Sequence, residues 1–241
     1  MNETVKKLLR RIPFLKDAYY VLKRARHRSL RSRTPEDIFT EYYTSNFWGD
    51  AESKSGSGSN QTNTELLVTN LRPTLDALAV TSLLDIPCGD FSWMKRVDLS
   101  GIDYIGGDIV ESLVASNNEL YSSPHRSFLR LDLLAEPLPA VDCILCRDCL
   151  VHLSFADLDL ALKNIVRSSA RYFATTTYNS ISKNYDIVTG DWRRLNLRVA
   201  PFNWPEPVNV IVEQSKEADG TYADKSLAFW SIAQLRAVIR P

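Results

Sequence analysis

Residues that could do chemistry gather between positions 142 and 152, in the stretch DCILCRDCLVH. Cys143, Cys146 and Cys149 recur at three-residue spacing, as ligands of a metal site or cysteines of a disulfide framework could. Structural zinc and iron–sulfur sites need more ligands, and the chain has one further cysteine, Cys88. A regular strand would also point Cys143 and Cys146 to opposite faces. We therefore expect no metal, and we expect Cys143 to be a small core residue.

The same stretch holds three residues that suit catalysis, namely Arg147, Asp148 and His152. Asp148 and His152 are four positions apart, which puts them on one face if a helix has begun by then. A carboxylate and an imidazole placed together can form an oriented general base. The alternative is that His152 only shapes a pocket, and the sequence leaves both interpretations open.

The elements that must position these residues follow from the apolar pattern. From residue 80, short apolar runs such as SLLDIP, YIGGDIV and VDCILCRD alternate with helical or loop stretches. This alternation predicts a mostly parallel sheet with helices on both faces. The runs are almost continuously apolar, as expected for strands buried on both sides. The last two runs, VNVIVEQS and KSLAFWSI, predict an antiparallel hairpin.

Three aspartates stand at the ends of successive predicted strands: Asp85, Asp108 and Asp132. Ligands of a doubly wound sheet bind beyond the carboxyl ends of its strands. The first of these loops lacks the G-x-G-x-x-G pattern of hydride-transfer enzymes, which disfavours a dinucleotide. A carboxylate at the position of Asp108 can accept hydrogen bonds from both hydroxyls of a ribose. The sequence therefore predicts a nucleotide-like ligand.

This succession of residues resembles the class I S-adenosylmethionine-dependent methyltransferases over about residues 80–178, with an extension through the final hairpin. The stretches DIPCGDFSWM and CRDCLVHLS are similar to those of a bacterial small-molecule subfamily. The resemblance implies an α/β fold, Rossmann-like and doubly wound, with a mostly parallel seven-stranded sheet, a C-terminal antiparallel hairpin and an N-terminal helical extension. The chain departs from the usual glycine-rich loop, because Pro87 and Phe91 replace common glycines and only Gly89 remains.

The resemblance also implies a cofactor, S-adenosylmethionine, and roles for individual residues. Asp148 and His152 would be catalytic, and Cys88 and Cys146, which end neighbouring strands, would line the cofactor pocket. The full set of implied cofactor-binding residues is Asp85, Pro87, Cys88, Gly89, Asp108, Ile109, Asp132, Leu133, Cys146 and Arg147.

The expected reaction is methyl transfer to the hydroxyl of a small molecule or sugar. Aromatic residues in the proline-containing segment 180–207 suit a substrate lid, and its paired arginines suit an acidic group on the acceptor. The residues expected to hold the acceptor are Tyr178, Arg193, Arg194 and Trp204. Two alternatives stay open: an N-methyltransferase of the same fold, and a non-catalytic module that docks through its N-terminal arm.

That arm, residues 1–33, carries eleven Lys and Arg against two acidic residues, although the whole chain has zero net charge. Apolar residues recur along it at helical spacing. Such an arm can lie on an anionic membrane, bind nucleic acid or pack on its own acidic domain. We favour internal packing, expect no nucleic acid and leave peripheral membrane contact open. Sparse cysteines and the lack of an apolar signal segment predict a cytoplasmic protein.

The chain divides into three predicted regions. After the arm, residues 34–79 supply N-terminal helices, with Thr34 as N-cap and Pro35 at the first helical position. Within this region the Ser- and Gly-rich stretch 51–65 is either a flexible linker or a loop that closes over a bound ligand. A helix should follow from about Thr64. Residues 80–241 form the predicted catalytic domain, which includes the lid.

Overall fold

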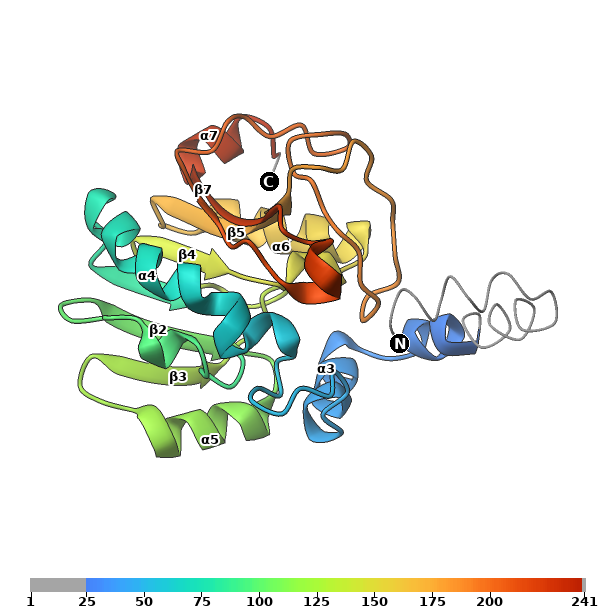
Figure 1. Ribbon diagram of the computed structural model, residues 1–241, viewed down its shortest axis with the longest axis horizontal. Coiled ribbons are helices and arrows are strands. Elements are labelled where there is room, and N and C mark those ends of the chain that lie inside the picture. Colours follow the sequence, from blue (N-terminus) through green and yellow to red (C-terminus); the bar gives the residue numbers. More distant parts are fainter. Residues whose placement is uncertain (1–24, 240–241) are drawn as a thin grey trace.

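The strands of the computed structural model, which describes residues 25–239, pair in the order β3-β2-β1-β4-β5-β7-β6 (Figure 1). The parallel strands are β1 (Ser82–Asp85), β2 (Asp103–Asp108), β3 (Arg126–Arg130), β4 (Cys143–Cys146) and β5 (Tyr172–Tyr178). β7 (Lys225–Ser231) runs antiparallel to both β5 and β6 (Asn209–Val212). The predicted parallel sheet and C-terminal hairpin are confirmed.

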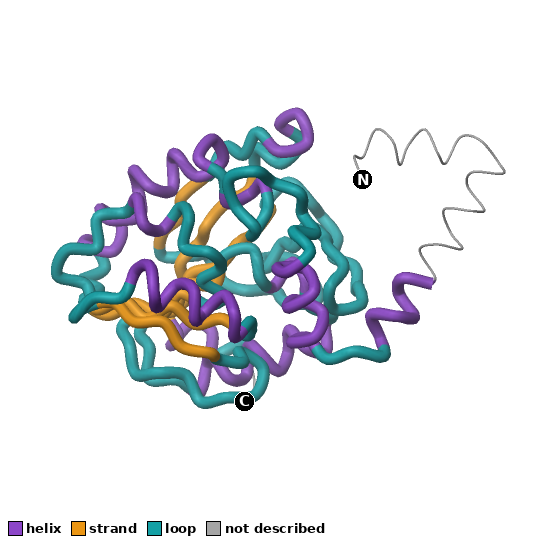
Figure 2. The backbone as a smooth tube through the Cα atoms, turned by 90° about the horizontal axis from the view of Figure 1, so that it is seen from below, coloured by secondary structure: helices purple, strands orange, loops and turns teal. Residues whose placement is uncertain are grey.

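Helices cover both faces of the sheet, which Figure 2 shows as strands between helical layers. The α-helices are α3 (Pro35–Thr44), α4 (Gln61–Ala77), α5 (Glu111–Tyr121), α6 (Phe155–Arg167) and α7 (Ile232–Arg236). Short 3₁₀ turns are η1 (Ser57–Ser59), η2 (Met94–Arg96), η3 (Leu150–His152) and η4 (Glu217–Gly220). One core cluster holds the apolar sides of α4 and α5, and a second holds those of α6 and α7.

The alternation of side chains along β4 explains where its cysteines go. Cys143 and Leu145 belong to the cluster under α4 and α5, whereas Ile144 and Cys146 belong to the cluster under α6 and α7. All four are fully buried. The prediction that Cys143 and Cys146 face opposite sides of the sheet is confirmed, and the pleat of a regular strand is the reason.

Capping residues set the starts of the N-terminal helices. Thr34 caps α3 in a reciprocal capping box with Asp37, and Pro35 occupies its first turn, as predicted. α4 begins at Gln61, three residues earlier than the expected Thr64, because the Asn60 side chain accepts a hydrogen bond from the backbone N–H of Asn63. The Ser- and Gly-rich stretch is therefore shorter than predicted.

Most of the predicted basic arm lies outside the described residues. Within its described part, residues 25–31 are helical, and Leu30 is buried against Ile38 and Tyr42 of α3. Across residues 25–239, no helix has the length and apolar character needed to cross a membrane.

Candidate active site

A cavity of about 970 Å³ opens at the carboxyl ends of β1, β2 and β4. The strand order reverses between β1 and β4, so the cavity lies at the switch point where open α/β sheets bind ligands. The remaining walls come from the N-terminal segment, from the chain after β3, from the chain after β5 and from the start of β7. Its volume is at the upper end of the range of small-molecule and cofactor pockets.

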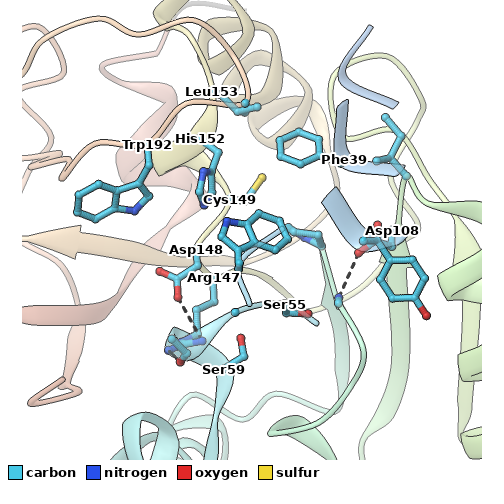
Figure 3. Close-up of a pocket in the computed structure, with 18 of the residues that line it drawn as sticks. Phe39, Ser55, Ser59, Asp108, Arg147, Asp148, Cys149, His152, Leu153 and Trp192 are labelled. Atoms are coloured by element: carbon cyan, nitrogen blue, oxygen red, sulfur yellow. Dashed lines mark hydrogen bonds and ion pairs between the residues drawn. The ribbon is translucent and has the colours of Figure 1, made fainter. Parts of the chain in front are cut away.

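Asp108 fixes the loop after β1 to the end of β2. Its carboxylate is buried and accepts hydrogen bonds from the backbone N–H groups of Gly89, at 3.1 Å, and Val110, at 3.0 Å. Burial raises the pKa of Asp108 to about 6, and the backbone donors limit the rise. The carboxylate is therefore mostly ionised at neutral pH and faces the cavity as a hydrogen-bond acceptor (Figure 3).

Asp85 is the last residue of β1. It is buried, and one carboxylate oxygen accepts the hydroxyl proton of Tyr104 at 2.8 Å. Burial raises the pKa of Asp85 to about 7, against the opposing effects of Tyr104 and Arg147. A cation bound in the cavity would favour the ionised form of this carboxyl group.

The Ser- and Gly-rich stretch forms one wall of the cavity. Asp90 holds it: its carboxylate accepts hydrogen bonds from the Ser53 hydroxyl, at 3.0 Å, and from the backbone N–H of Lys54, at 2.8 Å. Gly89 has a φ of 55°, and a Cβ on it would collide with the Ser55 hydroxyl. Glycine adopts this φ without strain and leaves room for the Ser55 side chain. Of the two interpretations of the stretch, these contacts favour the ligand-covering loop.

Most other predicted cofactor-binding residues line the cavity, namely Pro87, Cys88, Ile109, Asp132 and Leu133. Cys146 is an exception, because its position on β4 turns it into the core beneath α6. Cys149 lines the cavity instead. Among residues 25–239, no group of three or more His, Cys, Asp or Glu side chains is arranged to hold a metal ion.

Arg147 lines the cavity, but protein groups engage most of its guanidinium. It donates to the buried Glu213 carboxylate from Nη2, at 2.7 Å, and from Nε, at 3.2 Å. Nη2 also donates to the Gly58 carbonyl at 2.6 Å, and Nη1 lies 3.3 Å from an Asp148 oxygen. The guanidinium carbon stands 5.3 Å from the centre of the Trp93 ring. Arg147 thus anchors the Ser- and Gly-rich stretch through Gly58, and its expected contact with the cofactor stays a prediction.

The two catalytic candidates differ in their suitability as a base. Asp148 and His152 both line the cavity, but Asp148 precedes η3 in a left-handed conformation, so the predicted shared helix face does not form. Burial alone would raise the pKa of Asp148, yet Lys225, at 2.6 Å, and Arg147 hold it well below its usual range. Asp148 is therefore a weak base held in an ion-pair network.

His152 has the geometry of an oriented base. Its Nδ1 lies 2.9 Å from the Asp191 carbonyl, which can only accept, so Nδ1 carries a proton and Nε2 of the neutral ring is the acceptor. Burial lowers the pKa of His152, which keeps the ring neutral at physiological pH. The ring centres of Trp48 and Phe39 lie 5.9 Å and 6.4 Å away and hold the imidazole in place.

Of the residues expected to hold the acceptor, Tyr178 lines the cavity, and Arg193, Arg194 and Trp204 do not. The Arg193 side chain is fully buried and donates to the Val151 carbonyl at 3.2 Å, because the backbone N–H of Arg193 also bonds Val151 and turns the side chain inward. Trp204 packs in the core 5.0 Å from the ring of Trp230. The neighbouring Trp192 lines the cavity in their place.

The segment before α4 and the segment after β5 meet across the mouth of the cavity. Arg26 donates to the Gly190 carbonyl at 3.1 Å and pairs with the Asp191 carboxylate at 3.3 Å. His27 Nε2 lies 2.9 Å from the other Asp191 oxygen. The Tyr42 hydroxyl also donates to the Gly190 carbonyl, at 2.7 Å. These contacts form the mouth bridge.

Several cavity residues were not predicted from the sequence. They are Phe39, Tyr43 and Trp48 from the N-terminal segment, and Glu217 and Lys225 from the C-terminal hairpin. The three aromatic residues stand in a stretch that mixes aromatic and polar residues, and a lysine opens an apolar strand. Both are unusual local patterns, but neither says which distant element the side chain meets.

Comparisons with known proteins agree with the fold. No family model matches the chain, and no curated protein matches it. Among solved structures, the N-methyltransferase NodS from Bradyrhizobium japonicum, in complex with S-adenosyl-L-homocysteine, superposes with a TM-score of 0.57 at 17% identity, over 79% of this chain and 98% of that one. Human N-acetylserotonin methyltransferase, in complex with S-adenosylmethionine, gives 0.51 at 14% identity, over 83% of this chain.

The chain spans 60% of the human enzyme's length. At such identities the likeness shows the fold alone. The chain has the Rossmann-like α/β fold of the class I methyltransferases, as predicted from its sequence.

Proposed function

We propose that the protein is an S-adenosylmethionine-dependent methyltransferase that acts on the hydroxyl group of a small molecule or sugar. The observation that carries this proposal is the buried Asp108 carboxylate at the end of β2, held by backbone N–H groups and facing the cavity. A carboxylate in that place suits the paired hydroxyls of a ribose. The shared fold with two methyltransferases solved with S-adenosyl-L-homocysteine or S-adenosylmethionine supports the proposal.

The residues of the cavity fit this cofactor. Asp108 would accept from the ribose, Asp132 would contact the adenine amino group, and Ile109 and Leu133 offer apolar walls to the flat base. Asp85, whose buried carboxyl group is easily ionised by a nearby cation, suits a positively charged ligand. When bound, the cofactor supplies a methyl group on a cationic sulfur.

A hydroxyl acceptor must lose a proton during the reaction, and under this proposal His152 takes it. Its Nε2 is the acceptor nitrogen of a neutral imidazole whose orientation is fixed by the Asp191 carbonyl. Such a general base contributes roughly 10²–10⁴-fold to a rate. This feature favours a hydroxyl over an amine, because a neutral amine can attack before it loses a proton.

The cofactor assignment is tested by titrating S-adenosyl-L-homocysteine into the protein in a calorimeter. Asp108→Ala should lower the affinity by at least about ten-fold, because each charge-assisted hydrogen bond contributes roughly 1.5–3 kcal/mol. Asp103→Ala is the matched control, since Asp103 begins the same strand and its side chain is 70% exposed. Equal affinities in the two folded variants would remove the main support for the methyltransferase proposal.

The role of His152 is tested separately, once an acceptor is in hand. His152→Asn should lower kcat by about 10²-fold or more and leave the affinity for S-adenosyl-L-homocysteine unchanged. A variant that keeps the wild-type kcat would contradict the assignment of His152 as the base.

A further inference from the structure

One corner of the cavity, next to His152, has a lining unlike the rest. Three aromatic side chains form one side of it: Tyr178 from β5, Trp192 from the segment that follows, and Tyr222 just before β7. The ring centres of Trp192 and Tyr222 are 5.1 Å apart, at 6.3 Å and 6.0 Å from the ring centre of Tyr178. Trp192 and Tyr222 are only partly buried. We call this feature the aromatic corner.

The polar side of the aromatic corner consists of carboxylates around one lysine. Nζ of the buried Lys225 lies 2.6 Å from Asp148 and 3.4 Å from Glu217, and the buried Glu213 is 3.7 Å away. The side chains of Asp148 and Glu217 are 25% and 19% exposed, so their oxygens reach the cavity. Protein hydroxyls use part of their acceptor capacity, Thr176 on Asp148 and Ser57 and Ser215 on Glu217. A carboxylate oxygen has two lone pairs, so the remaining ones can accept bonds from a ligand.

The charges of this corner are mostly paired with one another, two cations with three carboxylates, which leaves little net charge to attract an ionic ligand. An ammonium group would approach Asp148 and Glu217 but would also meet the cations Lys225 and Arg147. An anion would meet the two exposed carboxylates. Neutral hydroxyl groups donate to carboxylates without adding charge, which makes them the suitable partners here.

The aromatic side chains add a requirement of shape. The indole of Trp192 offers a broad apolar surface beside the carboxylates. A ring that bears hydroxyls at its edge and C–H groups on its face satisfies both sides of the corner at once. A flat phenol would contact the aromatic rings but would bring only one hydroxyl donor to the two carboxylates.

We propose that the aromatic corner binds the acceptor as a neutral ring with several hydroxyl groups, a pyranose or another cyclic polyol; this inference rests on the proposed methyltransferase function. Trp192 covers one face of the ring, while Asp148 and Glu217 accept from neighbouring hydroxyls. Figure 3 shows Trp192, His152 and Asp148 on the same side of the cavity, so a ring held there places a hydroxyl near the candidate base.

The experiment uses the full chain saturated with S-adenosyl-L-homocysteine and ligand-observed NMR. The probes are methyl glycosides of neutral hexoses and 6-deoxyhexoses together with myo-inositol. Catechol, tyramine and glucose 6-phosphate represent phenols, amines and anions. We expect binding within the neutral polyol set alone.

Trp192→Ala should weaken polyol binding by about ten-fold, as for the loss of one ring contact, and Trp192→Phe should restore part of it. Phe202→Ala is the matched control: it removes a partly buried aromatic residue of the same segment that packs on the core and does not line the cavity, and it should leave binding unchanged. Calorimetry with S-adenosyl-L-homocysteine shows whether each variant keeps a folded cofactor site.

The outcomes separate the two proposals, because the probes are also titrated without S-adenosyl-L-homocysteine. Suppose that the protein binds S-adenosyl-L-homocysteine but prefers catechol, tyramine or the sugar phosphate, or binds no polyol at all. Either result overturns the polyol assignment and leaves the methyltransferase proposal standing. Polyol binding that Trp192→Ala does not weaken also overturns it. Failure to bind S-adenosyl-L-homocysteine refutes the proposed function. Polyol binding that depends on Trp192 would still support the assignment of the aromatic corner as a polyol site.

Discussion

Replacing Asp85 by asparagine should change how the stability of the protein depends on pH. Burial raises the pKa of this carboxyl group to about 7 from its ordinary 3.8, and the Tyr104 hydroxyl only partly offsets the effect. Folding therefore favours the protonated form. The contribution to stability is complete below about pH 4 and is lost as the pH rises through about 7.

The size of the effect follows from the shift. A difference of about three pKa units corresponds to about 4 kcal/mol at 1.36 kcal/mol per unit. About 3 kcal/mol of this should disappear between about pH 5 and pH 8, since part of it is already lost at pH 5. The amide side chain of the Asp85→Asn variant cannot ionise, so the variant lacks this dependence. The free energy of unfolding of the wild type, relative to Asp85→Asn, should fall by that amount over this interval.

The assay is urea unfolding of both proteins at the two pH values, without cofactor. Asp142→Asn is the control. Although burial opposes ionisation, Thr81 and Arg171 lower the pKa of Asp142 to about 2. The contribution of the ionised Asp142 to stability is therefore present above the pKa of the unfolded state. It is lost only as the pH falls through about 2. This control should lower stability equally at both pH values. A difference between wild type and Asp85→Asn that stays constant or grows from pH 5 to pH 8 would refute the reasoning.

Three further predictions test the surroundings of the cavity. Gly89→Ala should weaken binding of S-adenosyl-L-homocysteine in calorimetry, because a side chain at φ 55° costs roughly 1–2 kcal/mol and collides with Ser55; unchanged affinity would contradict this. Removal of residues 1–33 should lower the melting temperature by about 4 °C or more relative to removal of residues 1–24, because residues 25–33 make buried contacts with α3 and form part of the mouth bridge. Equal melting temperatures of the two truncated proteins would contradict this prediction. Cys143→Ala should cost roughly 1 kcal/mol in urea unfolding, and wild-type protein purified without chelators should hold no stoichiometric zinc or iron; metal that disappears in the variant would disprove this.

The strands and the Asp residues that follow them could be predicted because the information is local. Each strand is a short apolar run with a turn after it, and parallel strands bring their carboxyl ends to one edge. Asp85, Asp108 and Asp132 therefore fall at the cavity whatever the details of packing. The same reasoning placed Cys143 and Cys146 on opposite faces, because a strand alternates strictly.

Side chains on irregular segments could not be assigned in this way. Arg193 and Trp192 are adjacent in a stretch without periodicity, and only tertiary contacts decide that Trp192 faces the cavity and Arg193 the core. Lys225 is a similar case, since its effect on Asp148 depends on pairing between β5 and β7. The sequence suggested that Asp148 or His152 is the base. Choosing between them required the ion pair of Asp148 with Lys225, which lowers the pKa of Asp148.

The mouth bridge connects the entrance of the cavity with the candidate base. The Asp191 carboxylate pairs with Arg26 and His27, and the carbonyl of the same residue orients His152. Any motion that draws Asp191 away from the N-terminal segment also loosens the hold on the imidazole. Under the proposed function, ligand entry that separates these segments would also release the His152 imidazole, and proton transfer to His152 would require the contact to be in place. The turnover of the proposed enzyme would then depend on the lifetime of a contact between segments 164 positions apart.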